Sequence, residues 1–326
     1  MTSPYRSPLL DRPGAVEAAP PDAGVAAHYG DPLREQRRLA AGESAVDLSH
    51  RDVVRIGGPD RLGWLHSLTT QYLDGLQPGE ATTALLLSPH GHIEHAMYAV
   101  DDGAAFYAHV ESGTAPALVQ FLDSMRFLMR VEVEDVSAEY AVVWSPASGS
   151  SGTGLIRSTA RGTESFVRRA DLVAAVGDEP AGVWAYEALR IAAHEPRFGL
   201  DTDHRTIPHE VGWIGSAVHL DKGCYRGQET VARVHTLGRP PRRMVMLHLD
   251  GSVDHLPVKG DEVVLDGRAV GWIGSGARHY ELGPIALALV KRNVPVDATL
   301  LAGGVAAAQE VVVDPEVGLH VRPNLR

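Results

Sequence analysis

The sequence changes character at about Arg242. Downstream of this residue, short runs rich in aliphatic and β-branched residues are separated by Gly, Pro and Asp turns, and the clearest are RMVMLHL, DEVVLDG, RAVGWIGS and IALALV. Short β-rich runs with a turn between each pair are typical of a small barrel or sandwich. We therefore predict a small C-terminal β-barrel or sandwich over residues 241–326.

Residues 31–240 mix helical and strand periodicity. PDRLGWLHSLTTQYL and VWAYEALRIAAHEP have apolar residues at helical spacing, and TALLLSPHGHIEHAMYAV predicts two strands around a turn at Ser88 to Gly91. A further helix is predicted for TAPALVQFLDSMRFLM, with one apolar side formed by Leu118, Phe121, Leu122, Met125 and Met129. This mixture predicts an α+β fold.

The length of 326 residues exceeds what one hydrophobic core usually serves, so we expect two or three domains. Residues 1–30 are rich in Pro, Ala and Gly without apolar periodicity, which predicts a flexible N-terminal arm. Residues 145–154 are rich in Gly and Ser, which predicts a flexible surface loop.

Composition excludes several classes of protein. A single cysteine rules out an internal disulfide and fits a reducing compartment, so we expect a cytoplasmic protein. No run of about 18 apolar residues is present, so we expect no membrane partner. The formal net charge of -11 argues against direct nucleic-acid binding, which depends on clustered Lys and Arg.

That one cysteine, Cys224, lies in the segment DKGCYRGQETVAR. Neighbouring cations, Lys222 and Arg226, could stabilise its thiolate, which is the reactive form. Gly223 and Gly227 suit turns or a close approach of the backbone to a ligand. The alternative is that Cys224 is a small buried apolar residue, which is a common place for a free cysteine.

Two other groups of residues are candidates for a site. His90, His92 and His95 could suggest a metal, but strand alternation sends His92 to the face opposite His95, so we predict no metal site and expect His95 to point inward. The segment LRIAAHEPRFGLDTDHRTIPHE concentrates charged residues after a helix. It could line a polar pocket or form a solvated loop.

The segment DKGCYRGQETVAR resembles the signature K-G-C-Y-x-G-Q-E of the YgfZ family, folate-binding proteins related to the aminomethyltransferase T-protein of the glycine cleavage system. Every fixed position of that signature is present, from Lys222 to Glu229. The resemblance extends over about residues 31–312, through GGPDRLGWLHSLTTQYLDGLQPGE, LLLSPHGHI and DGRAVGWIGSGARHYELGPIALALV.

The resemblance implies a three-domain aminomethyltransferase-like folate-binding ring that ends in the β-barrel. Its folate-binding region would be residues 31–240, as two interleaved α+β domains, 31–55 with 135–240 and 56–134. The expected cofactor is tetrahydrofolate or a derivative. The implied functional residues are Cys224 and Lys222 for chemistry and, for the cofactor, Asp203, His204, Arg190, Tyr225, Gln228, Glu229, Arg233 and His95.

The sequence departs from the T-protein at the predicted hairpin. There the T-protein has a Gly-Gly-x-x-Asp-Asp pattern, and here the aligned residues run from Gly91 to Ala96 without an aspartate. Since alanine cannot take a proton from an amine, this favours the YgfZ branch, which is implicated in making or maintaining iron-sulfur enzymes, some of which modify tRNA. The expected partners are reduced folate and iron-sulfur enzymes or assembly factors. The alternatives are a folate-dependent one-carbon transferase and a non-catalytic folate-binding module.

Overall fold

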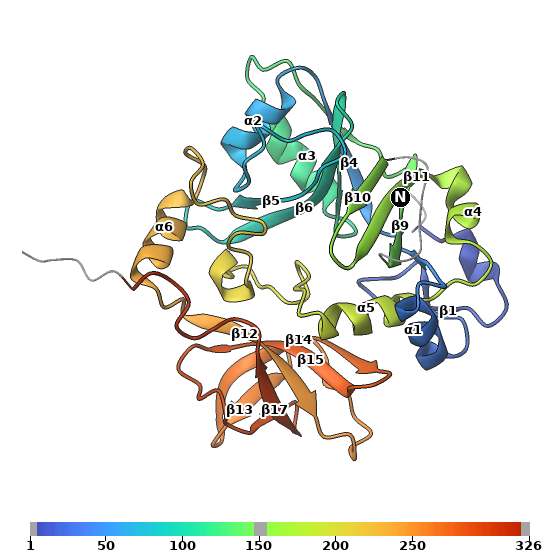
Figure 1. Ribbon diagram of the computed structural model, residues 1–326, viewed down its shortest axis with the longest axis vertical. Helices are drawn as coiled ribbons and strands as arrows, with labels where there is room; N and C mark the ends of the chain where they lie inside the picture. The colour runs from blue at the N-terminus through green and yellow to red at the C-terminus, as the bar shows by residue number, and fades with distance from the viewer. Residues whose placement is uncertain (1–4, 147–154, 321–326) are drawn as a thin grey trace, which may run out of the picture. The chain divides into compact units, whose positions relative to one another are not determined.

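The computed structural model describes residues 5–146 and 155–320 (Figure 1). The chain divides into two compact units. The first comprises Met1–Ser67, Gln71–Ala84 and His95–Glu187, and the second comprises Leu68–Thr70, Leu85–Glu94 and Ala188–Arg326. Most of the predicted Gly/Ser-rich loop, residues 147–154, lies outside the described residues. The domain boundaries expected from the sequence stay a prediction.

The N-terminal segment is not the flexible arm that its composition predicted. From Pro8 onward it contains a 3-10 helix, η1 (Pro8–Asp11), and a two-stranded sheet of β1 (Val16–Glu17) and β2 (Ala26–His28). Leu9 and Val25 are buried. Its buried apolar residues are Leu9, Ala18 and the short run 25–27, which form no repeating apolar pattern, so a search for periodic apolar positions does not detect them.

The first unit is built around two antiparallel sheets. One has the strand order β5-β6-β7-β4-β8 and the other the order β10-β11-β9-β3. The strand bounds of the larger sheet are Ala81–Leu87, Ile93–Asp101, Ala105–Val110, Asp52–Gly57 and Glu132–Asp135, in the order of the sheet. Those of the smaller sheet are Leu155–Ser158, Gly162–Arg168, Tyr140–Pro146 and Val46–Asp47.

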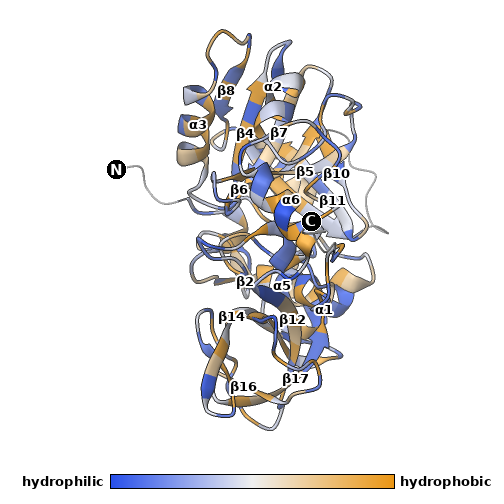
Figure 2. Ribbon diagram, turned by 90° about the vertical axis from the view of Figure 1, so that its left-hand side faces the viewer, coloured by the Kyte–Doolittle hydropathy of each residue, from blue (hydrophilic) through white to orange (hydrophobic). Residues whose placement is uncertain are grey.

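Short helices accompany these sheets. They are α1 (Pro32–Ala40), α2 (Arg61–Leu68), α3 (Ala115–Ser124), η2 (Arg169–Asp171), α4 (Leu172–Val176) and α5 (Val183–Ala192). Hydrophobic and hydrophilic residues alternate along α3, as Figure 2 shows, and its apolar side chains Leu118 and Leu122 are buried. No helix in the described parts of the chain is long and apolar enough to cross a bilayer.

The helix α3 is shorter than the sequence predicted. It ends at Ser124, and the backbone of Phe127 has a φ of 45°, which no right-handed helix can contain. Met129 therefore does not join the buried side of the helix and is 39% exposed. Apolar residues continue past the end of the helix, so a prediction from apolar periodicity alone makes the helix too long.

The second unit contains the predicted barrel. Six strands close in the order β12-β15-β14-β13-β16-β17. Their bounds are Arg242–Leu249, Gly283–Lys291, Arg268–His279, Glu262–Leu265, Leu300–Ala302 and Val305–Val311, in the same order. Alternate residues of β12, namely Val245, Leu247 and Leu249, belong to the barrel core. Closure removes the unpaired sheet edges that strands this short would otherwise leave.

Two short helices precede the barrel in the chain. They are η3 (Pro208–Val211) and α6 (Gln228–Leu237), and they contact each other. The loop that contains Cys224 leads directly into α6. The second unit also contains the hairpin turn between β5 and β6, where the amide of Gly91 donates to the carbonyl of Ser88, as the sequence predicted.

Candidate functional site

The loop before α6 is held by its lysine and its tyrosine. Lys222 is buried, and its Nζ donates a hydrogen bond to the carbonyl of Thr69 and lies 4.9 Å from the centre of the Tyr225 ring. Burial raises the pKa of Tyr225 to about 12. These contacts give Lys222 and Tyr225 a part in shaping the loop, whatever further part they have in chemistry or cofactor binding.

Cys224 is exposed, so the expectation of a small buried apolar residue does not apply to it. Its neighbour Arg226 forms an ion pair of 2.8 Å with Glu94, near the start of β6. The loop thus displays the thiol to solvent while the residues on either side of it are tied to other segments. A thiol displayed in this way can react with a partner molecule.

The two glycines of the motif have different surroundings. Gly227 has a φ of 83°, and a Cβ atom built on it would lie 2.6 Å from the carbonyl oxygen of Ser88. Gly91, in the hairpin, would place a Cβ 2.9 Å from the Cβ of Thr230 in α6. The hairpin turn and the start of α6 therefore pack backbone against backbone. Gly223 has no atom within 4 Å of such a Cβ.

The remaining motif residues lie on α6. Gln228 is half-buried, and Glu229 and Arg233 are exposed. Glu229 is in the first turn of the helix, where a negative charge interacts favourably with the helix dipole. That interaction is a structural role for Glu229 beside the cofactor-binding role expected from the sequence.

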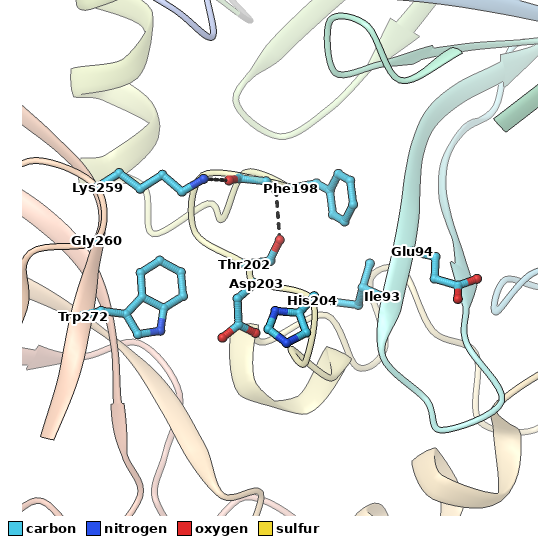
Figure 3. A pocket seen from close by; sticks show the side chains of 10 residues that line it. Ile93, Glu94, Phe198, Thr202, Asp203, His204, Lys259, Gly260 and Trp272 are labelled. Carbon is cyan, nitrogen blue, oxygen red and sulfur yellow. Dashed lines mark hydrogen bonds between the residues drawn. The ribbon is translucent and has the colours of Figure 1, made fainter. Parts of the chain in front are cut away.

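A pocket of about 810 Å³ lies within the second unit (Figure 3). Its walls come from the start of β6, the segment after α5 and the barrel. The lining residues are Ile93, Glu94, Phe198, Gly199, Thr202, Asp203, His204, Lys259, Gly260 and Trp272. The Asp203 and His204 side chains lie next to each other, with the Trp272 ring on the other side of Asp203. This volume is typical of sites for small organic ligands.

Asp203 and His204, named from the sequence, are thus part of this pocket. The other lining residues that could bind a ligand, Phe198, Lys259 and Trp272, were missed. Lys259 and Trp272 are in the predicted barrel, and no motif marks them. Phe198 lies in the polar segment that the sequence analysis singled out, but as an apolar residue it did not stand out.

The carboxylate of Asp203 is clamped by Arg242, the first residue of β12. Arg242 Nη1 donates to Asp203 Oδ2 at 2.6 Å, and Nη2 donates to Oδ1 at 3.1 Å. Thr206 Oγ1 and the amide of Arg205 also donate to Oδ1. Oδ1 is thereby saturated, whereas Oδ2 accepts one bond and keeps the capacity for another.

These bonds predict a pH dependence. Burial alone would raise the pKa of Asp203, but the hydrogen bonds from Arg242, Thr206 and the Arg205 amide hold that pKa well below its usual range. A group whose pKa is lowered on folding contributes stability that is complete above its unfolded pKa of about 3.9 and is lost as the pH falls through the folded pKa. We expect the gap in unfolding midpoint between wild type and Asp203→Asn to shrink below about pH 4. A gap that stays constant down to about pH 2 in urea unfolding would contradict this assignment.

Arg190 is not among the residues that line the pocket, although the sequence analysis assigned it to the cofactor. It is buried, and its Nη1 donates to Asp201 Oδ2 at 2.9 Å while its Nη2 donates to Ser275 Oγ at 2.8 Å. Ser275 Oγ in turn donates to Asp201 Oδ1 at 2.6 Å. We therefore expect Arg190 to hold the segment of Asp203 against β14 and not to contact a ligand.

His95 belongs to the first unit, where it is half-buried in β6. The rings of His90 and His92 lie 6.2 Å apart in the hairpin. Within residues 5–146 and 155–320, no group of three or more His, Cys, Asp or Glu side chains is placed to hold a metal ion.

Comparison with known proteins supports the fold. An aminomethyltransferase of Nostoc sp. is 25% identical over 307 residues, which cover 79% of this chain and 79% of the relative. The crystal structure of glycine cleavage system aminomethyltransferase T from Bartonella henselae matches with a TM-score of 0.75 and 18% identity over 95% of this chain and 96% of that one. The chain therefore has an aminomethyltransferase-like fold of mixed helices and sheets with a closed six-stranded C-terminal barrel, as the sequence predicted.

A second kind of relative is also similar. The mitochondrial iron-sulfur cluster assembly factor IBA57 homolog of Mycosarcoma maydis is 27% identical over 224 residues, which cover 61% of this chain and 55% of the relative. This chain thus aligns with just over half of that protein. No protein-family model matches the chain.

Proposed function

We propose that this protein binds tetrahydrofolate or a derivative and supports the synthesis or repair of iron-sulfur enzymes, as an auxiliary protein of the YgfZ type. The observation that carries the proposal is the pocket of the second unit, which combines aromatic walls, a carboxylate and a cation. The complete K-G-C-Y-x-G-Q-E signature and the similarity to an iron-sulfur cluster assembly factor homolog support it.

The pocket residues fit a folate by their chemistry. A pterin ring is flat and carries N–H donors, for which Trp272 and Phe198 offer apolar surfaces and Asp203 Oδ2 offers an acceptor. The glutamate tail of a folate carries carboxylates, for which Lys259 offers a positive charge near the carbonyl of Gly199, to which it is hydrogen-bonded. These residues would bind and orient the cofactor.

Cys224 would act toward the iron-sulfur partner. It is the only cysteine of the chain, and one thiol cannot supply the set of ligands that usually holds a cluster. The protein would therefore assist cluster enzymes without carrying a cluster itself. The roles open to the exposed thiol are exchange with an oxidised cysteine of a partner, contact with labile iron, or a structural role beside the folate. The reducing cytoplasm expected from the sequence, and a link to tRNA-modifying enzymes, belong to this proposal.

A folate-dependent aminomethyltransferase is the second candidate, because the Nostoc relative and the Bartonella structure carry that name. Against it, the aligned hairpin of this chain has His95 and Ala96 where the T-protein has two aspartates. No residue at those two positions offers a carboxylate that could orient or deprotonate an amine.

A titration of the full chain with tetrahydrofolate tests the proposal, with tryptophan fluorescence as the signal that reports binding. We expect saturable quenching, because Trp272 lines the pocket. Lys259→Ala and Asp203→Asn should each weaken the affinity about tenfold or more, since each removes a charged hydrogen-bond partner. Val258→Ser, next to Lys259 but not in the pocket lining, is the matched control.

The outcome separates the candidates. Binding without one-carbon product in the presence of an aminomethyl donor favours the auxiliary role, and product formation favours the transferase. The absence of saturable binding, or a wild-type affinity in both pocket variants, would overturn the folate assignment.

In cells that lack the gene, wild type should restore the activity of iron-sulfur enzymes under oxidative stress and Cys224→Ala should not. Full rescue by Cys224→Ala would reduce Cys224 to a structural residue.

A further inference from the structure

A second cavity, of about 340 Å³, lies within the first unit. Its walls come from the turn after η1, the turn between β2 and α1, the helix α1 itself and the segment after α4. The lining includes Arg12, Tyr29, Arg34, Arg38, Asp178 and Glu179. We call this space the α1 cavity. Its volume is at the lower end of the range for ligand sites, so it suits a small molecule, and none of its lining residues lines the pocket of Asp203.

Three arginines of the α1 cavity act on one exposed carboxylate. Arg38 forms an ion pair with Glu179, whose side chain is 66% exposed. The hydrogen bond and the charge of Arg38 lower the pKa of Glu179, and the charges of Arg34 and Arg12 lower it further. Only Arg38 is paired directly. Within residues 5–146 and 155–320, the Arg34 guanidinium has no hydrogen bond or ion pair, and that of Arg12 donates to one carbonyl oxygen, that of Asp178, at 2.8 Å.

The carboxylates of the α1 cavity differ in how far their oxygens are occupied. Both oxygens of Glu35 accept backbone amide hydrogens, at 2.7 and 2.9 Å. Asp31 Oδ1 accepts the amide of Arg34 at 3.0 Å and caps α1. The carboxylate of Asp178 is exposed and has no hydrogen bond or ion pair in the part of the chain that the structure describes. Arg34 and Asp178 therefore leave one unpaired charge of each sign at the same cavity.

The cavity is also lined by a tyrosine whose hydroxyl lacks a protein partner. The hydroxyl of Tyr29 is buried, and no described residue is within hydrogen-bond distance of it. Buried hydroxyl groups are nearly always hydrogen-bonded, so this one points to a polar group of a ligand. Burial raises the pKa of Tyr29, so the hydroxyl keeps its proton and can donate it. The charge of Arg12 opposes that rise, which places the guanidinium within electrostatic reach of the hydroxyl.

We propose that the α1 cavity binds a free α-amino acid in its zwitterionic form. The carboxylate of the ligand would accept hydrogen bonds from Arg12, Arg34 and the Tyr29 hydroxyl. Its ammonium group would donate to the carboxylate of Asp178. The bond from Arg12 Nη1 to the Asp178 carbonyl brings a cationic and an anionic residue into one corner of the cavity. In an α-amino acid the two charged groups are attached to the same carbon atom, so both can be bound in that corner.

Other small ligands match the lining less well. Four carboxylates line the cavity together with the three guanidinium groups, so a phosphate or a dicarboxylate would meet repulsion. An amine without a carboxylate would leave Arg34 and the Tyr29 hydroxyl without a partner. Pro13 and Pro180 add apolar surface to the lining, which favours an amino acid with a small apolar side chain.

Isothermal titration calorimetry of the full chain tests the proposal, with L-alanine, L-valine, L-leucine and L-proline as the probes. We expect saturable binding of at least one of them. The amide of that amino acid lacks the carboxylate charge, and the corresponding acid without an amino group lacks the ammonium charge. Each of these analogues should bind at least about tenfold more weakly, because each loses a charged hydrogen-bond partner. Inorganic phosphate should also bind more weakly than the amino acid.

Charge variants test the two unpaired groups. Arg34→Ala and Asp178→Asn should each lower the affinity for the amino acid about tenfold or more. The matched controls are Arg37→Ala, on the same helix, and Asp171→Asn, an exposed acid of the same unit. Neither of these residues lines the cavity, so both controls should keep the wild-type affinity.

Tyr29→Phe separates a binding role from a structural one. Removal of a buried hydroxyl that has no protein partner should leave the unfolding midpoint of the chain without amino acid unchanged or raise it, and should lower the affinity for the amino acid. A lower midpoint with a wild-type affinity would contradict the proposal. So would a lack of binding of all four probes, phosphate or the acid without an amino group binding as tightly as the amino acid, or a wild-type affinity in both charge variants.

The result is independent of the proposed function. Lys259→Ala should keep the wild-type affinity for the amino acid, and Arg34→Ala should keep the wild-type affinity for tetrahydrofolate, because the two cavities share no lining residue.

Discussion

Replacing Asp201 with alanine is expected to lower the free energy of unfolding of the second unit by about 3–5 kcal/mol, the usual cost of removing one partner of a buried ion pair. Asp201 is 1% exposed and accepts hydrogen bonds from Arg190, Ser275 and the amide of Arg197. Its loss removes the carboxylate that pairs with the buried guanidinium of Arg190 at 2.9 Å. Urea unfolding followed by circular dichroism measures the effect.

The matched control is Asp254→Ala. Asp254 also pairs with an arginine, Arg278, at 2.7 Å, but its side chain is fully exposed, so its removal should leave the unfolding midpoint unchanged. If Asp201→Ala and Asp254→Ala behaved alike, the buried network would not hold this unit together. Because Asp201 is two residues from Asp203, which lines the pocket, the same variant should also lower the affinity of the pocket for its ligand.

Replacing Gly227 with alanine is expected to destabilise the second unit by at least about 2 kcal/mol. Two costs add here. Alanine disfavours the φ of 83°, and its Cβ would lie 2.6 Å from the Ser88 carbonyl oxygen and 3.1 Å from the Cβ of Leu87. The hairpin or the start of α6 must then move, and the loop that displays Cys224 moves with it.

Gly223 supplies the control from the same motif. It has no positive φ and no atom within 4 Å of a built Cβ, so Gly223→Ala should leave the unfolding midpoint close to that of wild type. The two variants can be compared by thermal unfolding and by the rate at which Cys224 reacts with a soluble disulfide reagent. An equal effect of both glycines on stability would show that the close packing of Gly227 on the hairpin is unimportant.

Sequence alone was informative wherever a local pattern carries the information. The barrel strands follow from alternation and turns, because alternate side chains of a strand point to opposite faces. The turn at Ser88 to Gly91 follows from local turn chemistry. Prediction from local patterns failed where tertiary packing decides the structure. The segment before residue 30 is packed although its apolar residues are not periodic, and α3 ends at Ser124 although apolar residues continue after it.

The site shows the same division. The sequence identified Cys224, its motif and the charged segment that contains Asp203, because the residues of each group are close together in the sequence. Only the tertiary structure showed that Arg190 is hydrogen-bonded to Asp201 and Ser275. The same holds for the packing of Gly227 on the hairpin and for the pocket that Lys259 and Trp272 form with Asp203. The physical reason is that hydrogen-bond partners and pocket walls come from segments far apart in the sequence, such as those of Ile93 and Trp272. Whether such segments meet depends on how the whole unit packs, which no local pattern encodes.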